Sequence, residues 1–175
     1  QEAHDRGIVH RDLKPENVLL AGDRDRLVPK VVDFGIARVL EGTTYTMTGA
    51  LLGTCRYMSP EQVQSPDSVG HRSDIYSLGL TPYELTTGRH PFDGFDEVEI
   101  LSRIVRGVYA PPSEVSPGFP DDLERIIMNL LAVDPGMRPS SARDVLTWFE
   151  GVAVSQGFPL TMSRIADFVR AQGVD

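Results

Sequence analysis

Apolar residues recur every three or four positions through most of the second half of the chain. The pattern is clearest over 96–106 and 121–132, where charged residues occupy the positions between the apolar ones. Residues 74–87, 141–150 and 163–171 show the same period over shorter stretches. The sequence therefore predicts a mainly helical fold in this part.

The first third of the chain has a different pattern. Ile8–Val9, Val18–Leu20 and Lys30–Val32 are short apolar or β-branched pieces that turn-forming residues separate. Residues 23–26 form a polar turn between two of these pieces. A few short β-strands are predicted here, and no sustained helical period.

Turn and loop signals divide the predicted elements. Residues 1–6 resemble the end of a helix that Gly7 terminates, and Pro82 lies inside an otherwise helical pattern, where it removes one backbone donor. Residues 36–58 are rich in Thr and Gly without a sustained period, which predicts a long mobile loop of the kind that is usually either functional or disordered. Residues 110–120, rich in Pro and Gly, are predicted to link two helices within one domain.

Length and composition fit one globular domain. The 175 residues are enough to bury a core without disulfides, and the single cysteine, Cys55, excludes an intrachain disulfide. The longest apolar runs are far shorter than the roughly 18 residues of a membrane span, and no signal peptide is evident. A cytoplasmic location is expected, with any membrane anchor lying outside this segment.

The net charge of -8 is unevenly distributed along the chain. Residues 1–60 hold eight acidic and eight basic side chains, whereas residues 61–175 hold seventeen acidic and nine basic ones. Nucleic acids and anionic lipids are bound by clustered Lys and Arg. The sequence therefore predicts neither nucleic acid nor a membrane surface as a partner.

Candidate chemistry is concentrated in the run HRDLKPEN, His10–Asn17, and in the DFG that begins at Asp33. Phosphoryl transfer needs a carboxylate base, a cation on the moving phosphoryl group and oxygen ligands for Mg²⁺. Asp12, Lys14 and Asn17 supply one of each, and Asp33 adds a second metal ligand. Either motif alone would more often be an ordinary loop or turn.

Further segments follow in a fixed order. They are GTCRYMSPE at 53–61, DIYSLG at 74–79 and the Arg138-Pro139 pair. The whole series resembles the protein kinase family, with Ser59 where the A-P-E segment has Ala. Lys14 is typical of the Ser/Thr branch, and YMSPEQ with RSDIYSLG is most similar to the bacterial eukaryote-like kinases.

The resemblance implies a protein-kinase-like C-terminal lobe, mainly α with a few short β-strands, over residues 1–150. Residues 151–175 would be a C-terminal helical extension. Only nine residues precede His10 and no G-x-G-x-x-G occurs, so the small lobe is expected to be absent. Such a lobe would belong to an ATP-dependent Ser/Thr protein kinase but be inactive alone. The alternative is a noncatalytic binding module, a truncated or pseudokinase-like lobe.

Family roles can be assigned to matching residues. Asp12 is expected as catalytic base and Lys14 as the contact to the transferred phosphoryl group. Asn17 and Asp33 would hold Mg²⁺, and Leu19 would lie beneath the adenine of ATP. The implied cofactors are ATP and Mg²⁺, and the implied partners are protein substrates with Ser or Thr acceptors and an N-terminal kinase lobe.

The resemblance also implies structural contacts. His10 and Phe34 would stack on each other, although two ordinary core aromatic residues would fit the pattern equally. Glu61 and Arg138 would form a partly buried ion pair. Asp74 would accept hydrogen bonds from the backbone at the start of the catalytic loop.

Regulation is expected in the long loop. Arg11 would bind a phosphate there, because a guanidinium matches phosphate geometry. Thr46 and Thr48 lie where bacterial kinases are autophosphorylated, whereas Thr54 is expected to help hold the catalytic side chains. For any one of these threonines the alternative is a solvated hydroxyl.

Two acidic residues suggest a mild substrate preference. Glu16 and Glu84 match positions that face an Arg upstream of the acceptor in kinases that prefer basic peptides. The alternative is a solvated acidic face, since both residues also occur in kinases without that preference.

Overall fold

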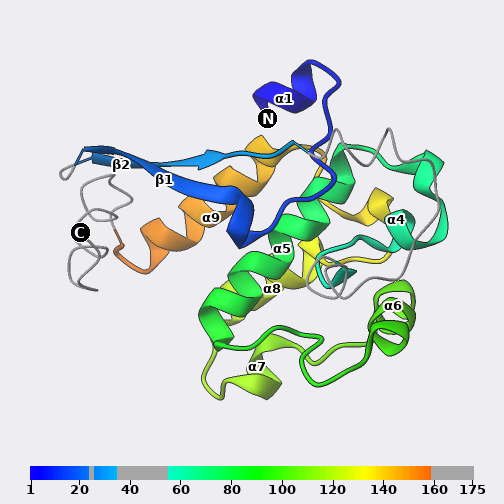
Figure 1. Cartoon of the computed structure of the whole chain (residues 1–175). Coiled ribbons are helices and arrows are strands. Elements are labelled where there is room, and N and C mark those ends of the chain that lie inside the picture. The colour runs from blue at the N-terminus through cyan, green and yellow to red at the C-terminus, as the bar shows by residue number, and fades with distance from the viewer. Residues whose placement is uncertain (24–25, 35–54, 159–175) are drawn as a thin grey trace.

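Helix α5 (His71–Thr87) runs through the centre of the protein, and the other helices pack around it (Figure 1). The computed structural model describes residues 1–23, 26–34 and 55–158. In chain order the elements around α5 are α1 (Glu2–Asp5), η1 (Pro15–Asn17), β1 (Val18–Asp23), β2 (Arg26–Val31), α4 (Pro60–Gln64), η3 (Pro66–Ser68), α6 (Glu97–Arg106), α7 (Pro112–Val115), α8 (Asp121–Leu130), η4 (Pro135–Met137) and α9 (Ala142–Ser155).

Helix α5 is buried over much of its length, and its buried residues include Ile75, Tyr76, Leu80 and Tyr83 as well as polar side chains. It begins at His71, one turn before the predicted start, and ends at Gly88, whose left-handed backbone (φ 70°) closes the last turn. Pro82 does not break it, because Pro removes only one backbone donor and the helix continues on both sides. The predicted helix is confirmed and its boundary is corrected.

Close packing of α5 on α8 depends on a glycine. A Cβ atom at Gly79 would lie 2.6 Å from the Cβ of Leu130 and 3.1 Å from the Cδ2 of Leu131. Leu130 and Leu131 are fully buried and belong to two adjoining clusters of the core. The glycine therefore lets the two helix backbones approach closely enough to exclude water.

Helices α6, α8 and α9 confirm three predicted amphipathic stretches. The side chain of Asp96 caps α6 by accepting from the backbone of Glu99 at 2.9 Å, and Ser141 caps α9 in the same way. Helix α9 extends to Ser155, five residues beyond the predicted end at 150. The helix predicted over 163–171 lies outside the described residues.

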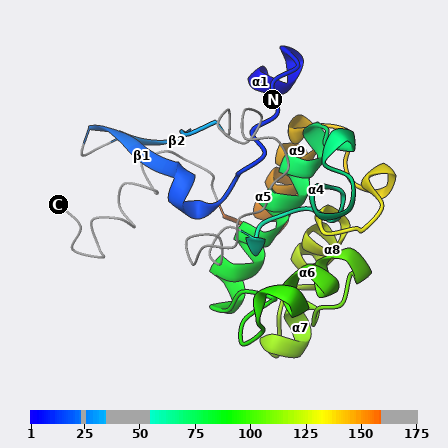
Figure 2. The same ribbon diagram turned by 45° about the vertical axis from the view of Figure 1, so that its right-hand side comes forward.

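The β1 and β2 strands form an antiparallel hairpin that projects from the helical body (Figure 2). Val18 pairs with Val31 at its base and Gly22 with Leu27 near its end. The predicted pieces Val18–Leu20 and Lys30–Val32 thus belong to one sheet, the only one in the described part of the chain. Ile8–Val9, predicted as a strand, has no strand structure.

Two short helices were missed by the sequence patterns. Helix α4 begins with a capping box in which Ser59 and Gln62 bond each other's backbone N–H groups. Helix α7 lies within the predicted linker 110–120. Of the predicted loop 36–58 only residues 55–58 are described, and there Cys55, Tyr57 and Met58 are buried. Four or five residues are too few to show a helical period.

None of the helices in the described ranges is long and apolar enough to cross a membrane.

Candidate active site

Three predicted site residues meet in the loop that leads into η1. The Nζ of Lys14 lies 3.2 Å from the Oδ2 of Asp12. The amide nitrogen of Asn17 donates to the backbone oxygen of Asp12 at 2.7 Å and to its Oδ2 at 3.2 Å. The loop therefore holds the carboxylate of Asp12 between a cation and an amide.

Asp74, at the start of α5, fixes the backbone of this loop. Its Oδ2 accepts from the N–H of His10 at 2.8 Å, and its Oδ1 accepts from the N–H of Arg11 at 2.9 Å. Arg11 has a left-handed backbone (φ 68°), a conformation that costs a non-glycine residue about 1 to 3 kcal/mol. These hydrogen bonds hold the loop in that conformation.

Two further side chains complete the support, and sequence reasoning missed both. The Nε2 of Gln62 in α4 donates to the backbone oxygen of Arg11 at 2.7 Å. The Nε2 of His4 in α1 lies 2.8 Å from the Oδ2 of Asp74. No local pattern marks either contact, because the partners are 51 and 70 positions apart.

Asp33 is tied to the same loop through its neighbour Val32, at the end of the hairpin. The N–H of Val32 donates to the backbone oxygen of Asn17 at 2.9 Å, and the Nε2 of His10 lies 2.9 Å from the oxygen of Val32. The rings of His10 and Phe34 have centroids 4.7 Å apart. Asp33 itself is exposed and has a left-handed backbone (φ 56°).

The oxygen donors of this region fit Mg²⁺ in type. Asn17 turns its amide nitrogen towards Asp12, which leaves its Oδ1 for a cation, and Asp33 presents an exposed carboxylate. Within the described ranges no three His, Cys, Asp or Glu side chains gather as a metal cluster. That is compatible with Mg²⁺, which usually takes one or two protein oxygens and completes its shell with water and phosphate. Leu19, predicted beneath the adenine, is 53% exposed.

Glu61 and Arg138 form a bidentate ion pair between α4 and the end of η4. Their nitrogen–oxygen distances are 2.7 and 2.8 Å, and Ser73 donates to the same carboxylate at 2.6 Å. Burial alone would raise the pKa of Glu61, but the hydrogen bonds from Arg138 and Ser73 outweigh it and lower that pKa. Arg138 also donates to three backbone oxygens, so the pair joins segments 77 positions apart.

A second polar cluster begins at Tyr57. Its hydroxyl donates to the Oε2 of Glu84. Burial, followed by this hydrogen bond and the negative charges of Glu84 and Glu16, raises the pKa of Tyr57. Both acidic residues of the predicted basic-peptide preference therefore influence one tyrosine, while the preference itself stays a prediction.

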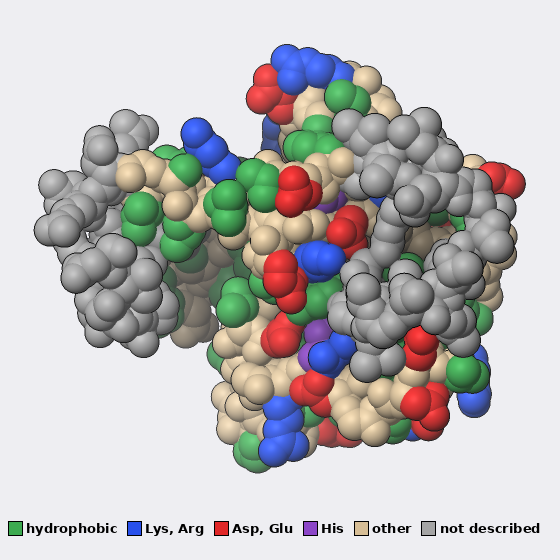
Figure 3. All heavy atoms as spheres, viewed as in Figure 1, with side chains coloured by type: hydrophobic (Ala, Val, Ile, Leu, Met, Phe, Trp, Pro, Cys, Tyr) green, Lys and Arg blue, Asp and Glu red, His purple; other side chains and the backbone are tan. Residues whose placement is uncertain are grey.

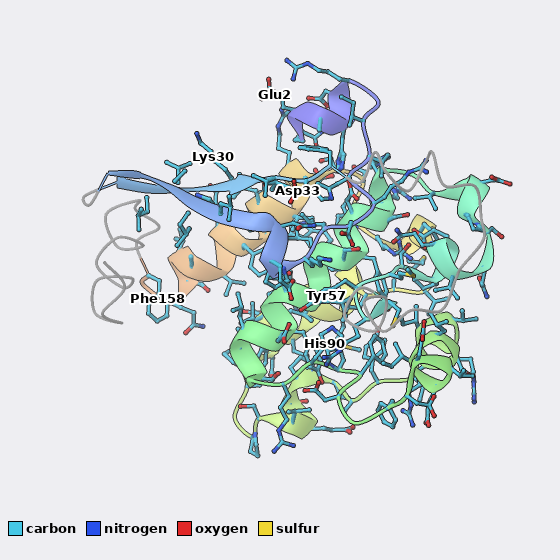
Figure 4. The ribbon with its side chains drawn as sticks, in the orientation of Figure 1. Glu2, Lys30, Asp33, Tyr57, His90 and Phe158 are labelled. Atoms are coloured by element: carbon cyan, nitrogen blue, oxygen red, sulfur yellow. The ribbon has the colours of Figure 1, made fainter. Side chains whose placement is uncertain are left out.

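His90 lies next to Tyr57 (Figure 4). Its backbone N–H donates to Asp93 at 2.9 Å, and Asp93 also pairs with Arg56. Burial, helped by the charge of Arg56, lowers the pKa of His90 to about 3, so the ring is neutral at pH 7. Acidic and basic side chains are intermixed in the middle of the face that Figure 3 shows.

The predicted regulatory residues are only partly described. Arg11 is half-buried in the catalytic loop. Thr46, Thr48 and Thr54 lie outside the described residues, so their predicted roles stay predictions.

Comparison with known proteins agrees with this geometry. The family described as protein kinase domain matches residues 1–149. The chain belongs to the protein kinase family. The predicted fold class, a kinase-like large lobe, is confirmed in its mainly helical architecture with one two-stranded sheet.

Curated proteins similar to this chain include bacterial Ser/Thr kinases. Serine/threonine-protein kinase PknB of Mycobacterium tuberculosis is 41% identical over 145 residues, which is 82% of this chain and 22% of that protein. A probable PknB of Bifidobacterium longum is 41% identical over 167 residues, 91% of this chain and 24% of the relative. Probable serine/threonine-protein kinase PkwA of Thermomonospora curvata is 42% identical over 139 residues, which is 79% of this chain and 17% of that protein. The chain thus spans about a fifth of the length of these relatives.

Proposed function

We propose that this kinase domain transfers the γ-phosphoryl group of ATP to Ser or Thr hydroxyls of proteins. The observation that carries the proposal is the position of Asp12, held beside Lys14 and Asn17 in a loop that Asp74 fixes. Similarity to bacterial Ser/Thr kinases supports the substrate class. A binding module would have no chemical need for this arrangement.

In the proposed mechanism Asp12 accepts the proton of the attacking hydroxyl. Its carboxylate is partly exposed, so a substrate hydroxyl can approach it, while Asn17 holds its orientation. Lys14 lies close enough to Asp12 to contact both the carboxylate and a phosphoryl oxygen beside it. Catalysis of this kind depends on positioning and on electrostatic stabilisation more than on covalent chemistry.

Asn17 and Asp33 are the residues that would hold Mg²⁺ bound to ATP. The metal, when bound, neutralises negative charge on the phosphates and orients them. The backbone hydrogen bond between Asn17 and Val32 keeps the two ligands on adjoining segments. Leu19, with its exposed side chain, would contact the adenine from below.

The test uses the longest natural polypeptide that contains residues 1–175. Its activity is measured as the transfer of labelled phosphate from ATP to a protein substrate. Asp12→Asn should retain Mg-ATP binding and lose turnover, because the amide has nearly the same shape as the carboxylate but cannot act as a base. Asp33→Ala should lose both, because a metal ligand is removed. Asp67→Asn, an exposed carboxylate in η3, is the matched control and should behave as wild type.

Near-normal transfer by Asp12→Asn or Asp33→Ala would remove the assignment of these residues. If no transfer occurs in the unmodified protein under any activating condition, the noncatalytic binding module becomes the better description.

We further propose that a phosphate on Thr46 or Thr48 activates the domain by pairing with Arg11. New charge-assisted hydrogen bonds can order a loop and fix the neighbouring Asp12. Mass spectrometry of the active protein should find one of the two threonines modified, and Arg11→Gln should reduce activity even in protein that is fully modified there. Full activity with both threonines unmodified would contradict the proposal.

A further inference from the structure

A groove of about 390 Å³ lies between α8 and α9, and it shares no lining residue with the candidate active site. Ile126, Trp148 and Val152 give it an apolar floor, and Asp122, Arg125 and Asn129 line its α8 side. Asp122 and Arg125 pair with each other at 2.5 Å. The groove therefore combines an apolar floor with a charged edge, as helix-binding grooves do.

The floor of the groove is open to an additional side chain. Trp148, the one tryptophan of the sequence, is 38% exposed. A Cβ atom placed on Gly151 would meet nothing within 4 Å. Covering such apolar surface is favourable by about 25 cal/mol per Å² removed from water.

The chain itself leads away from this groove. Ser155, the last residue of α9, is part of its lining. Gly157 then takes a left-handed backbone (φ 68°), and the N–H of Phe158 donates to the oxygen of Ala153 at 2.8 Å, which turns the chain out of the helix direction. Phe158 lies at the end of α9 (Figure 4) and is 62% exposed.

Seventeen residues follow Phe158 in the sequence, and the helix predicted over 163–171 has one apolar face. Ile165, Phe168 and Val169 share that face at the spacing of one helical turn, with Arg164 at its edge and Arg170 on the opposite side. A short amphipathic helix of this kind needs a surface against which to bury its apolar face.

Lengths agree with a return of the chain into the groove. The groove follows α9 from Trp148 to Ser155, about 10 Å of helix. A helix over 163–171 would be about 13 Å long. The connection from Phe158, at the end of α9, to residue 163 can span at most roughly 18 Å, which exceeds the length of the groove.

We propose that residues 163–171 dock as a helix in the α8–α9 groove, with Ile165, Phe168 and Val169 against Trp148 and Ile126. The occupant is this chain's own segment rather than a second copy, because a short tether gives it a high effective concentration at the groove. Residues beyond the catalytic lobe thereby stabilise the lobe at α9. This inference does not rest on the proposed kinase activity.

The single tryptophan makes the proposal directly testable by fluorescence. Phe168→Asp in the 175-residue chain should shift the emission of Trp148 to longer wavelength. It should also make acrylamide quenching about twofold faster, because a covered indole becomes 38% exposed. Ser163→Asp adds the same charge on the opposite side of the predicted helix and should leave both readouts unchanged. Circular dichroism should show that both variants keep the fold.

Second, Ile165→Asp in the 175-residue chain, on the same predicted face as Phe168, should show the emission of the Phe168→Asp variant. Identical emission of wild type and Phe168→Asp would overturn the proposal. Shielding that disappears on roughly hundredfold dilution of the 175-residue chain would also overturn it, because it would identify a second copy as the occupant.

Discussion

The Glu61–Arg138 ion pair is the contact with the largest expected effect of a single side chain on stability. Both side chains are nearly buried, with 10% and 0% exposure. Glu61→Gln should therefore lower the free energy of unfolding by about 3 to 5 kcal/mol, because the guanidinium would keep its burial and lose its counter-charge. Urea denaturation measures the change.

The matched control is Glu99→Gln, which breaks an exposed pair with Arg103 one turn away on α6. A surface pair of this spacing contributes only about 0.3 to 0.5 kcal/mol. Equal losses in the two variants would show that burial of the Glu61 pair has no special effect.

His90 gives the protein a sensitivity to mild acid. Its pKa is about 3 in the folded protein, below the ordinary value of 6.5, so the folded state binds fewer protons than the unfolded state between these values. Stability is therefore retained above pH 6.5 and lost as the pH falls towards 3, by about 1.4 kcal/mol per pH unit. Arg56 opposes protonation and Asp93 favours it.

The measurement compares free energies of unfolding at pH 7 and pH 5.5. Wild type should lose about 1 kcal/mol more than His90→Asn over this interval, whereas His71→Asn, at an exposed histidine, should follow wild type. The carboxylates with lowered pKa values, Glu61 and Asp144, titrate below this interval. A wild-type loss equal to that of His90→Asn would contradict the assignment.

At the scale of elements, the close contact of α5 with α8 lies between the two clusters of the hydrophobic core. Gly79→Ala should lower the free energy of unfolding by about 1 to 3 kcal/mol, because the new methyl group would meet Leu130 at 2.6 Å and force the helices apart. Thermal or urea unfolding records the loss.

The control for helix propensity is Gly151→Ala in α9, where an added Cβ meets no atom within 4 Å. There Ala should stabilise the protein by about 0.5 to 1 kcal/mol. If Gly79→Ala also stabilised it, the close approach of α5 and α8 would not hold in solution.

The spacing of hydrophobic residues predicted the long helices and missed the short ones. Helices α6 and α8 follow it closely because each has one buried and one exposed face. Helix α5 began earlier than predicted, since a helix buried on most sides carries polar residues such as Ser73 and Asp74 that find partners only in the folded protein. Helix α4 depends on its capping box rather than on a period.

At the scale of the whole molecule, we expect the 175-residue chain assayed by itself to bind Mg-ATP weakly and to show no turnover. Phosphoryl transfer requires the triphosphate to be held from several sides, and Asp12, Asn17 and Asp33 approach it from one loop and its neighbour. Between exposed charges about 4 Å apart the attraction falls to about 1 kcal/mol in water. Calorimetry with Mg-ATP and a kinase assay measure both quantities.

Micromolar binding with measurable turnover by this chain would contradict the expectation. Asp33→Ala is the control in calorimetry, because any heat that remains in this variant does not come from the proposed metal site.

The chemistry of the candidate site was determined by the sequence itself. Asp12, Lys14 and Asn17 lie within six positions of one another, so a single loop brings them together whatever surrounds it. Their order with the DFG segment was enough to indicate the family. The roles of Asp74, Glu61 and Arg138 also followed, through resemblance to that family rather than from any local pattern.

The tertiary structure alone decided how that loop is held. The left-handed backbone of Arg11 needs the carboxylate of Asp74, 63 positions away, and the amide of Gln62, 51 positions away. The depressed pKa of His90 likewise needs burial and the nearby charge of Arg56. Sequence patterns report the local period of a chain, whereas hydrogen bonds between distant segments and the loss of water around a side chain exist only once the segments have packed.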